Sequence, residues 1–209
     1  FSAGSPGRLS LGIQCLDRRL RGGLRGGTMS LLGAGTGAGK TALVQQWACH
    51  AARTTGQGVL FVSPEMSLEA LAERELIREA RVELWDIAPW RGNDRSRQFA
   101  QEALAKAAGR LVSERLNVIA LESLSPSMAE IEAAALDEHA RAPLCLVVLD
   151  YAQYIANDPT GRAPRYLQVG DVSRGAVALA RKLNIPVLVT AQMNIAREKG
   201  GGAVYSWRE

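Results

Sequence analysis

The sequence predicts an α/β fold with a mainly parallel central sheet and helices on both of its faces. The first reason is that short apolar runs alternate with longer helical stretches, as they do in successive βα units. The second is that a run such as Leu146–Leu149 is apolar throughout, which is typical of a parallel strand that helices cover on both sides. The chain has 209 residues, of which 47% are hydrophobic and 22% charged, and these values fit one globular domain.

The predicted strands and helices alternate in order along the chain. The strands are Met29–Leu32, Val59–Val62, Asn117–Ala120, Leu144–Leu149 and Val187–Thr190. The helices are Lys40–Arg53, Ser67–Ala80, Asp94–Leu111, Ser127–Ala140 and Leu167–Leu183. The run Ser-Leu-Glu-Ala and a preceding proline are plausible starts for the second and fourth helices. Three Gly- or Pro-rich stretches stand between elements, at Leu20–Gly27, Asn157–Arg165 and Lys199–Ala203, and no repeat or linker divides the chain.

A glycine-rich loop connects the first predicted strand to the first predicted helix. It reads Gly33-Ala34-Gly35-Thr36-Gly37-Ala38-Gly39-Lys40-Thr41. This context predicts a phosphate-binding loop, because glycines let backbone N–H groups converge on phosphates at the positive end of a helix dipole. Lys40 would reach the β- and γ-phosphates, and Thr41 would bind Mg²⁺. The strict pattern has glycine where this chain has Ala34, and we expect the flanking glycines to supply the flexibility.

Three polar residues follow other predicted strands and should meet at the same edge of the sheet, where ligands bind. Asp150 would hold the water shell of the metal ion, Glu65 would act as general base for the attacking water, and Gln192 would sense the γ-phosphate. Each also has a simpler structural interpretation. Asp150 could cap the next turn, Glu65 could be the acidic residue in the first turn of the next helix, and Gln192 could be a polar loop residue.

Composition excludes several classes of protein. The net charge is +4, with basic residues concentrated towards both ends and acidic residues in the middle, which allows a polyanionic partner without requiring one. The three cysteines are widely spaced and fit neither a disulfide framework nor a zinc site, so we predict that they are buried apolar residues. No apolar run reaches the ~18 residues of a membrane span, and no signal peptide is visible, so we predict a cytoplasmic protein that does not contact membranes.

The order of these motifs resembles the RecA-like motor domain of the DnaB family of bacterial replicative helicases, from about Leu11 to Glu209. The matching runs are Gly12-Ile13-x-x-Leu16-Asp17, the phosphate-binding loop, Ser63-x-Glu65-Met66, Asp150-Tyr151-x-Gln153, Ser173-Arg174 and Gln192-x-Asn194. The resemblance implies a RecA-like P-loop NTPase that uses ATP, or another NTP, with Mg²⁺. It assigns phosphate and metal binding to Lys40 and Thr41, water activation to Glu65, the metal shell to Asp150 and nucleotide sensing to Gln192.

The resemblance also implies a domain arrangement and partners. Residues 1–10 would be the remnant of a linker, and residues 11–209 a RecA-like ATPase domain that is incomplete at its C-terminus; the start at Phe1 likewise suggests a fragment. The arginine finger is expected beyond Glu209. The family run Ser-Asp-Leu-Arg-Glu-Ser is altered before Arg208, so no role is carried over to that residue. In the full-length protein we expect a hexameric ring on single-stranded DNA, with primase and a helicase loader as partners.

Two basic stretches are candidates for the DNA-facing loops that the family uses. One is Asn157–Arg165, with Arg162 and Arg165, and the other is Ile195–Ala203, with Arg197 and Lys199. Arginine side chains and glycine N–H groups can bind phosphates without reading bases, which suits a motor that ignores sequence. Both stretches could instead be mobile surface loops.

Two other classes of function remain open. A recombination or repair ATPase that resembles RecA or RadA would share the phosphate-binding loop, although RadA's run of four cysteines is not seen ahead of it. A non-motor ATP-binding loader or a regulatory ATPase that resembles KaiC would also share it. Phosphorylation-site residues and a doubled domain of the KaiC type are not visible in the sequence.

Overall fold

The computed structural model describes residues 7–83, 94–113, 118–121, 125–155, 165–197 and 203–207. The chain forms two compact units by its internal contacts. Unit 1 comprises Phe1–Glu65 and Asn117–Glu209, and unit 2 comprises Met66–Leu116. Unit 1 contains the central sheet, and the described residues of unit 2 form two helices.

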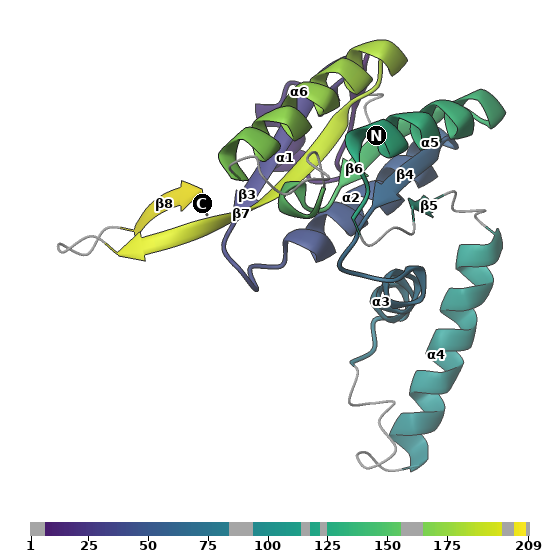
Figure 1. Ribbon diagram of the computed structural model, residues 1–209. Helices are drawn as coiled ribbons and strands as arrows, with labels where there is room; N and C mark the ends of the chain where they lie inside the picture. The colour runs from purple at the N-terminus through teal and green to yellow at the C-terminus, as the bar shows by residue number, and fades with distance from the viewer. Residues whose placement is uncertain are drawn as a thin grey trace. The chain divides into compact units, whose positions relative to one another are not determined.

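The predicted α/β fold is confirmed in unit 1 (Figure 1). Its strands are β3 (Met29–Ala34), β4 (Gly58–Val62), β5 (Val118–Leu121), β6 (Leu144–Leu149) and β7 (Val187–Arg197). They form a parallel sheet in the order β3-β7-β6-β4-β5, and β8 (Ala203–Trp207) pairs antiparallel with β7. The strands on either side of β6 are far from it in sequence, so the centre of the sheet is assembled entirely from long-range contacts.

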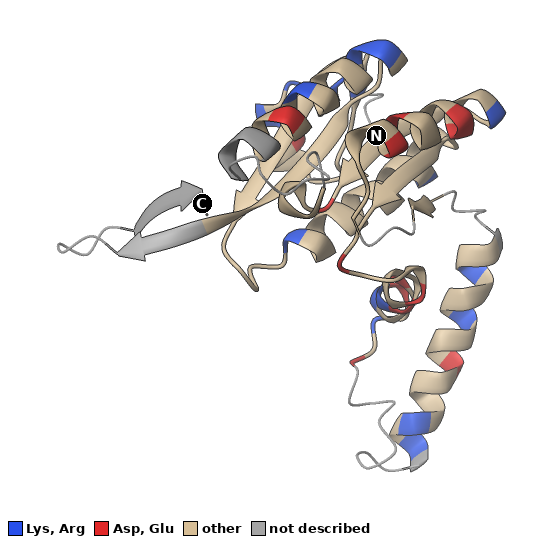
Figure 2. Cartoon of the chain, viewed as in Figure 1, with Lys and Arg blue, Asp and Glu red and all other residues tan. Residues whose placement is uncertain are grey.

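Helices cover the two faces of this sheet. On one face, α5 (Met128–Arg141) and α6 (Arg165–Leu183) pack against Leu60 and Val62 of β4 and against alternate residues of β6 and β7. Val59 and Phe61 of β4 alternate with these residues and point to the other face of the sheet, where they are also fully buried. On that face, α2 (Lys40–Thr55) contacts the strands. Burial on both faces explains why β4 and β6 carry no charged residue, and Figure 2 shows the charges gathered on the helices instead.

The helix starts follow from local capping chemistry. Ser127 is the N-cap of α5 and forms a capping box with Glu130, whose carboxylate accepts from the Ser127 backbone N–H at 2.7 Å. In unit 2, Ser67 caps α3 (Leu68–Ala80) by accepting from the backbone N–H of Ala70 at 3.3 Å. The second helix of unit 2 is α4 (Asp94–Ser113). All five predicted helices are therefore present, with ends that differ from the prediction by at most two residues.

The N-terminal run Gly12-Ile13-x-x-Leu16-Asp17 is explained by a short hairpin and helix. Strands β1 (Arg8–Leu9) and β2 (Leu24–Arg25) pair antiparallel and enclose α1 (Gln14–Arg19). The Asp17 carboxylate accepts from the Leu11 backbone N–H at 2.9 Å and from the Ser10 hydroxyl at 2.7 Å, which ties the start of α1 to the segment before it. These three elements were not predicted, because two-residue strands and a six-residue helix leave no periodic pattern in the sequence.

Several other sequence predictions need correction. Strand β7 does not end at Thr190 but continues to Arg197, and β8 begins at Ala203, so the predicted loop Ile195–Ala203 is partly strand. The physical reason is that β8 supplies backbone partners for residues 193–197, which no neighbouring parallel strand pairs. Cys15 is exposed, whereas Cys49 and Cys145 are buried as predicted, and burial raises the pKa of the Cys145 thiol.

Candidate functional site

The glycine-rich loop joins the end of β3 to the start of α2, as predicted. Gly37 and Gly39 have φ values of 71° and 83°, a backbone region that side chains with a Cβ rarely adopt. Ala34 differs because it is the last residue of β3, paired with Gln192 of β7 in the parallel ladder. An extended strand residue does not need glycine, so alanine is accommodated where the strict motif has glycine.

Lys40 and Thr41 begin α2 directly after the loop. The Lys40 ammonium group donates to the backbone carbonyl oxygens of Ala34 at 3.0 Å and Gly35 at 2.8 Å, which holds it against the inner side of the loop. The first backbone N–H groups of this 16-residue helix have no partner within the helix and lie at the positive end of its dipole. Together these groups could hold a phosphate-sized anion.

Asp150 follows β6 directly and is almost completely buried, with 1% of its surface exposed. Its Oδ1 atom accepts a hydrogen bond from the Thr190 hydroxyl at 2.5 Å, and Thr190 has no exposed surface. The next turn is the 3₁₀ helix η2 (Ala152–Tyr154), whose N-cap is Tyr151 and which has no side-chain cap. Asp150 therefore does not cap that turn, and its carboxylate is oriented by β7.

Thr190 was not among the predicted site residues. A threonine at the end of an apolar strand resembles any other β-branched strand residue, so the sequence contains no clear signal for its role. Its importance depends on β6 and β7 being adjacent, which only the strand order reveals.

Gln192 connects the phosphate-binding loop to β7. Its side-chain amide donates to the hydroxyl of Thr36, which lies in the loop. Its backbone is held by Gln153, whose side chain donates to the Gln192 carbonyl oxygen at 3.1 Å and accepts from the Gln192 N–H at 3.4 Å. Gln192 is thus a strand residue in contact with the loop, and Gln153 is a second residue of this network that the prediction did not assign a role.

Glu65 is exposed and lies three residues after the end of β4. It is not in the first turn of the following helix, because α3 begins at Leu68 and its first-turn acidic residue is Glu69. Hydrogen bonds from its own backbone N–H and from the Ser67 hydroxyl hold the pKa of Glu69 below its usual value. The simpler interpretation of Glu65 as a helix-start carboxylate is therefore wrong.

The predicted DNA-contacting residues are only partly within the described structure. Arg162 and Lys199 lie outside the described residues, as does Arg208. Arg165 is the first residue of α6, and Arg197 is the last residue of β7. Their side chains also lie outside what is described, so the structure gives only their backbone positions.

Within the described residues, no group of three or more His, Cys, Asp or Glu side chains could hold a metal ion by itself. The site does contain two oxygen donors of the kind Mg²⁺ prefers, the Asp150 carboxylate and the Thr41 hydroxyl. Mg²⁺ commonly keeps several waters and binds through one or two protein oxygens together with substrate phosphates. These residues therefore fit Mg²⁺ that arrives with a nucleotide better than a resident metal ion.

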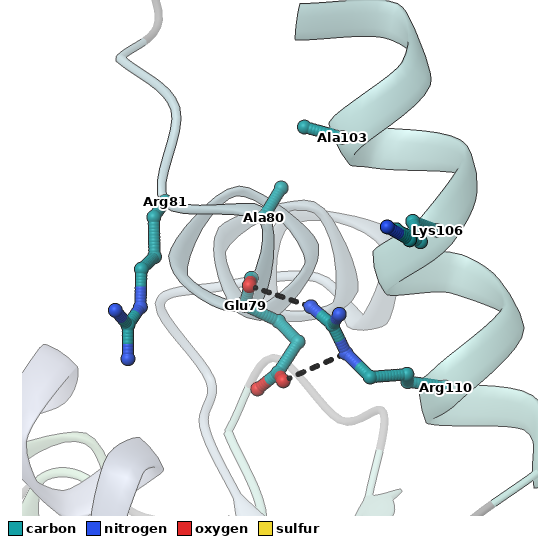
Figure 3. A pocket seen from close by; sticks show the side chains of 6 residues that line it. All are labelled: Glu79, Ala80, Arg81, Ala103, Lys106 and Arg110. Atoms are coloured by element: carbon teal, nitrogen blue, oxygen red, sulfur yellow. Dashed lines mark hydrogen bonds and ion pairs between the residues drawn. The ribbon is translucent and has the colours of Figure 1, made fainter.

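A cavity of about 400 Å³ lies in unit 2 (Figure 3). Its lining residues all come from α3, α4 and the residue after α3: Glu79, Ala80, Arg81, Ala103, Lys106 and Arg110. Arg110 fastens the two helices by donating to the Glu79 carbonyl oxygen at 3.1 Å and pairing with its carboxylate at 3.3 Å. None of the predicted site residues contributes to it.

Among all the residues that the structure describes, none of the helices has the length and apolar character of a membrane span.

Comparison with known proteins gives consistent matches. A family model described as the DnaB-like helicase C-terminal domain matches residues 9–201. A protein named replicative DNA helicase DnaB from Treponema pallidum is 26% identical over 205 residues, which are 94% of this chain and 45% of that protein. The protein of the same name from Leifsonia xyli is 29% identical over 196 residues, 94% of this chain and 41% of its own length. The chain thus spans less than half the length of these relatives.

Solved structures with similar folds agree with the architecture. One is described as a DnaB-like replicative helicase and its interactions with primase; it has a TM-score of 0.80 at 21% identity and covers 92% of this chain and 45% of its own. Another is described as an ATPase domain, with a TM-score of 0.77 at 20% identity, covering 91% of this chain and 66% of its own. At these identities the likeness describes the fold, which is that of RecA-like ATPase domains.

Proposed function

Because this chain belongs to the DnaB-like helicase C-terminal domain family, we propose that it is the ATPase motor domain of a replicative DNA helicase, which couples ATP hydrolysis to movement along single-stranded DNA. The observation that carries the proposal is the convergence of three segments at one edge of the parallel sheet. The phosphate-binding loop, Asp150 after β6 and Gln192 in β7 are linked by hydrogen bonds through Thr36 and Thr190. A site of this kind suits a nucleoside triphosphate.

In this proposal, α2 and the loop bind the nucleotide phosphates. Backbone N–H groups of the loop, the Lys40 ammonium group and the Thr41 hydroxyl would surround the β- and γ-phosphates. The Lys40 ammonium group donates to the carbonyl oxygens of Ala34 and Gly35, which places this cation beside the loop that would hold the phosphates. Mg²⁺, when bound with the nucleotide, would neutralise developing charge on the phosphates.

Coupled hydrolysis requires a base for the attacking water and a residue that senses the γ-phosphate, besides the phosphate site. Glu65 would accept a proton from the attacking water; its exposed position after β4 leaves its carboxylate accessible to solvent water. Asp150, held by Thr190, would accept hydrogen bonds from water bound to Mg²⁺. Gln192 would transmit the state of the γ-phosphate from Thr36 to β7, the strand that ends at Arg197.

The partners in this proposal are single-stranded DNA and other copies of the chain. Arg162, Arg165, Arg197 and Lys199 would contact phosphates of the DNA, and the complete protein would form a hexameric ring. Primase and a helicase loader would bind the complete protein, which would act in the cytoplasm. The primase interaction described for a structural neighbour and the shared family support this view.

The test is binding of a labelled oligothymidine at several salt concentrations with a Mg²⁺-loaded, slowly hydrolysed ATP analogue present. Each lost phosphate contact should lower the slope of log affinity against log salt by about 0.7 for a single strand. The variant has four substitutions, Arg162→Ala, Arg165→Ala, Arg197→Ala and Lys199→Ala. The matched control replaces four exposed cations of unit 1 elsewhere, Arg18, Arg19, Arg181 and Lys182.

We expect the slope to flatten in the first variant and to stay near the parent value in the control. Equal slopes in the two variants would remove these four residues from the DNA path. Nucleotide binding without any affinity of the parent for DNA would favour the alternative, a non-motor ATP-binding loader or regulatory protein.

A further inference from the structure

Ser63, the first residue after β4, buries a hydroxyl group with no visible purpose in the protein alone. The residue is 7% exposed, and its Oγ atom has no hydrogen-bond partner among the residues that the structure describes. Burying an unpaired hydroxyl destabilises a protein, and such groups are uncommon in folded structures. A buried hydroxyl without a partner therefore calls for an explanation, such as a ligand or an ordered water.

The sheet register puts Ser63 beside Asp150. Val62 of β4 pairs with Leu149 of β6, so the two residues that follow leave adjacent parallel strands at the same level. The backbone N–H of Asp150 donates to the Val62 carbonyl oxygen at 2.8 Å, which extends the pairing to the end of both strands. Ser63 and Asp150 are therefore neighbours at the carboxyl edge of the sheet.

Alternation along the strands puts both side chains on the face that α2 covers. Val62 and Leu149 belong to the core shared with α5 and α6, so Ser63 and Asp150, one residue later, face the opposite side. The hydrogen bond between Asp150 and Thr190 agrees with this direction, because Val189 also belongs to the α5–α6 core. The first residues of α2 on that same face are the ones that bind phosphate and metal in the proposed function.

Two neighbouring polar side chains at this edge already have partners in the protein. Asp150 Oδ1 accepts from the Thr190 hydroxyl, and the Gln192 side-chain amide donates to the Thr36 hydroxyl. We propose that Ser63 is a positioning residue for the metal: its hydroxyl accepts a hydrogen bond from a water molecule in the Mg²⁺ shell that Asp150 also holds. The inference rests on the proposed nucleotide function and extends it to a residue with no role in it so far. A hydroxyl suits this task because it can accept from a metal-bound water and donate to a neighbouring oxygen.

This role predicts that Ser63→Ala weakens Mg²⁺ binding but does not lower the stability of the metal-free protein. Without the metal, Ser63→Ala removes an unpaired buried polar group, so the melting temperature should stay the same or rise. With Mg²⁺ and nucleotide, the same change removes a hydrogen bond to the hydration shell. Loss of an outer-shell partner typically lowers metal affinity by about 10- to 100-fold. We therefore expect the Mg²⁺ concentration that gives half-maximal nucleotide binding to rise about tenfold.

The experiment measures binding of a fluorescent ADP analogue to the 209-residue chain while Mg²⁺ is titrated, and again in EDTA. Thermal unfolding without nucleotide is recorded in parallel. The matched control is Ser173→Ala on α6, because the Ser173 hydroxyl donates to the Val169 carbonyl of its own helix at 3.0 Å. Asp150→Asn is the positive control for loss of Mg²⁺ dependence.

We expect Ser63→Ala to need about ten times more Mg²⁺, to bind the analogue in EDTA as the parent does, and to unfold at the parent temperature or above. Ser173→Ala should keep the parent Mg²⁺ dependence. An unchanged Mg²⁺ half-point in Ser63→Ala would overturn the role of Ser63 while leaving the nucleotide site intact. Weaker binding in EDTA together with a lower melting temperature would make Ser63 a structural residue and would also overturn it. A parent that binds no nucleotide under any condition would overturn both proposals.

Discussion

The hydrogen bond between Thr190 and Asp150 offers a direct test of how the candidate site is held together. Thr190→Val removes the hydroxyl that donates to Asp150 Oδ1 and keeps nearly the same side-chain shape. Thr190 is 0% and Asp150 is 1% exposed, so water cannot easily replace the lost donor. The variant should therefore leave a buried carboxylate oxygen without its donor, and the folded state should lose stability.

The size of the loss follows from the charge and burial of the acceptor. A hydrogen bond to a charged group contributes about 1.5 to 3 kcal/mol, and an unpaired buried partner adds to the cost of losing it. For a domain of 150–250 residues, 1 kcal/mol corresponds to about 2 to 4 °C in melting temperature. We expect Thr190→Val to lower the free energy of unfolding by about 2 kcal/mol and the melting temperature by roughly 4 to 8 °C.

The assay is urea and thermal unfolding followed by circular dichroism, with a double-mutant cycle. Thr28→Val is the matched control, because the Thr28 hydroxyl donates to the neutral, exposed carbonyl oxygen of Arg25 at 2.8 Å and its loss should cost about 1 kcal/mol or less. In the second arm of the cycle, Thr190→Val is made in Asp150→Asn. Removing the charge should reduce the cost of the threonine substitution by about half.

Two results would refute the reasoning. If Thr190→Val costs as much in Asp150→Asn as in the parent, the loss comes from packing and not from the charged hydrogen bond. If Thr190→Val is as mild as Thr28→Val, burial of the pair does not strengthen it.

Three further predictions follow from other parts of the structure. Lys40→Ala should abolish tight ATP binding measured by titration calorimetry, because the loop loses its side-chain cation; unchanged affinity would contradict the phosphate-site assignment. Glu65→Gln should retain ATP binding and slow hydrolysis by roughly 10² to 10⁴, the usual effect of losing a general base, and an unchanged rate would exclude that role. Gly23→Ala should lower stability in urea by about 1 to 3 kcal/mol, because φ is 112° and a Cβ would lie 1.9 Å from the Leu9 carbonyl oxygen, whereas Gly109→Ala in α4 meets no neighbour and should be neutral or stabilising.

Local chemistry explains why much of this fold could be predicted from the sequence. The run Leu144–Leu149 is apolar without interruption because it is buried on both faces, and that pattern is visible without knowing its neighbours. Ser67 and Ser127 mark helix starts because each side-chain oxygen accepts a hydrogen bond from an otherwise unpaired backbone N–H three residues later. The phosphate-binding loop was recognisable for the same reason, since strand, loop and helix are consecutive.

The edge of the sheet was also predictable, but only in outline. The carboxyl ends of parallel strands meet at one edge, so Asp150, Gln192 and the loop could be expected close together. Which side chains contact each other could not. The Thr190–Asp150 and Gln192–Gln153 contacts join residues 40 and 39 positions apart, and the Gln192–Thr36 contact joins residues 156 positions apart.

The sequence by itself determined the elements whose pattern is local: the buried strands, the capped helices and the phosphate-binding loop. The tertiary structure alone decided that β7 lies between β3 and β6, that it extends to Arg197 with β8 as its partner, and that Ser63 is buried beside Asp150. The physical reason is that hydrogen bonding across a sheet depends on strand order and register, and those are set by the packing of the whole core on α2, α5 and α6.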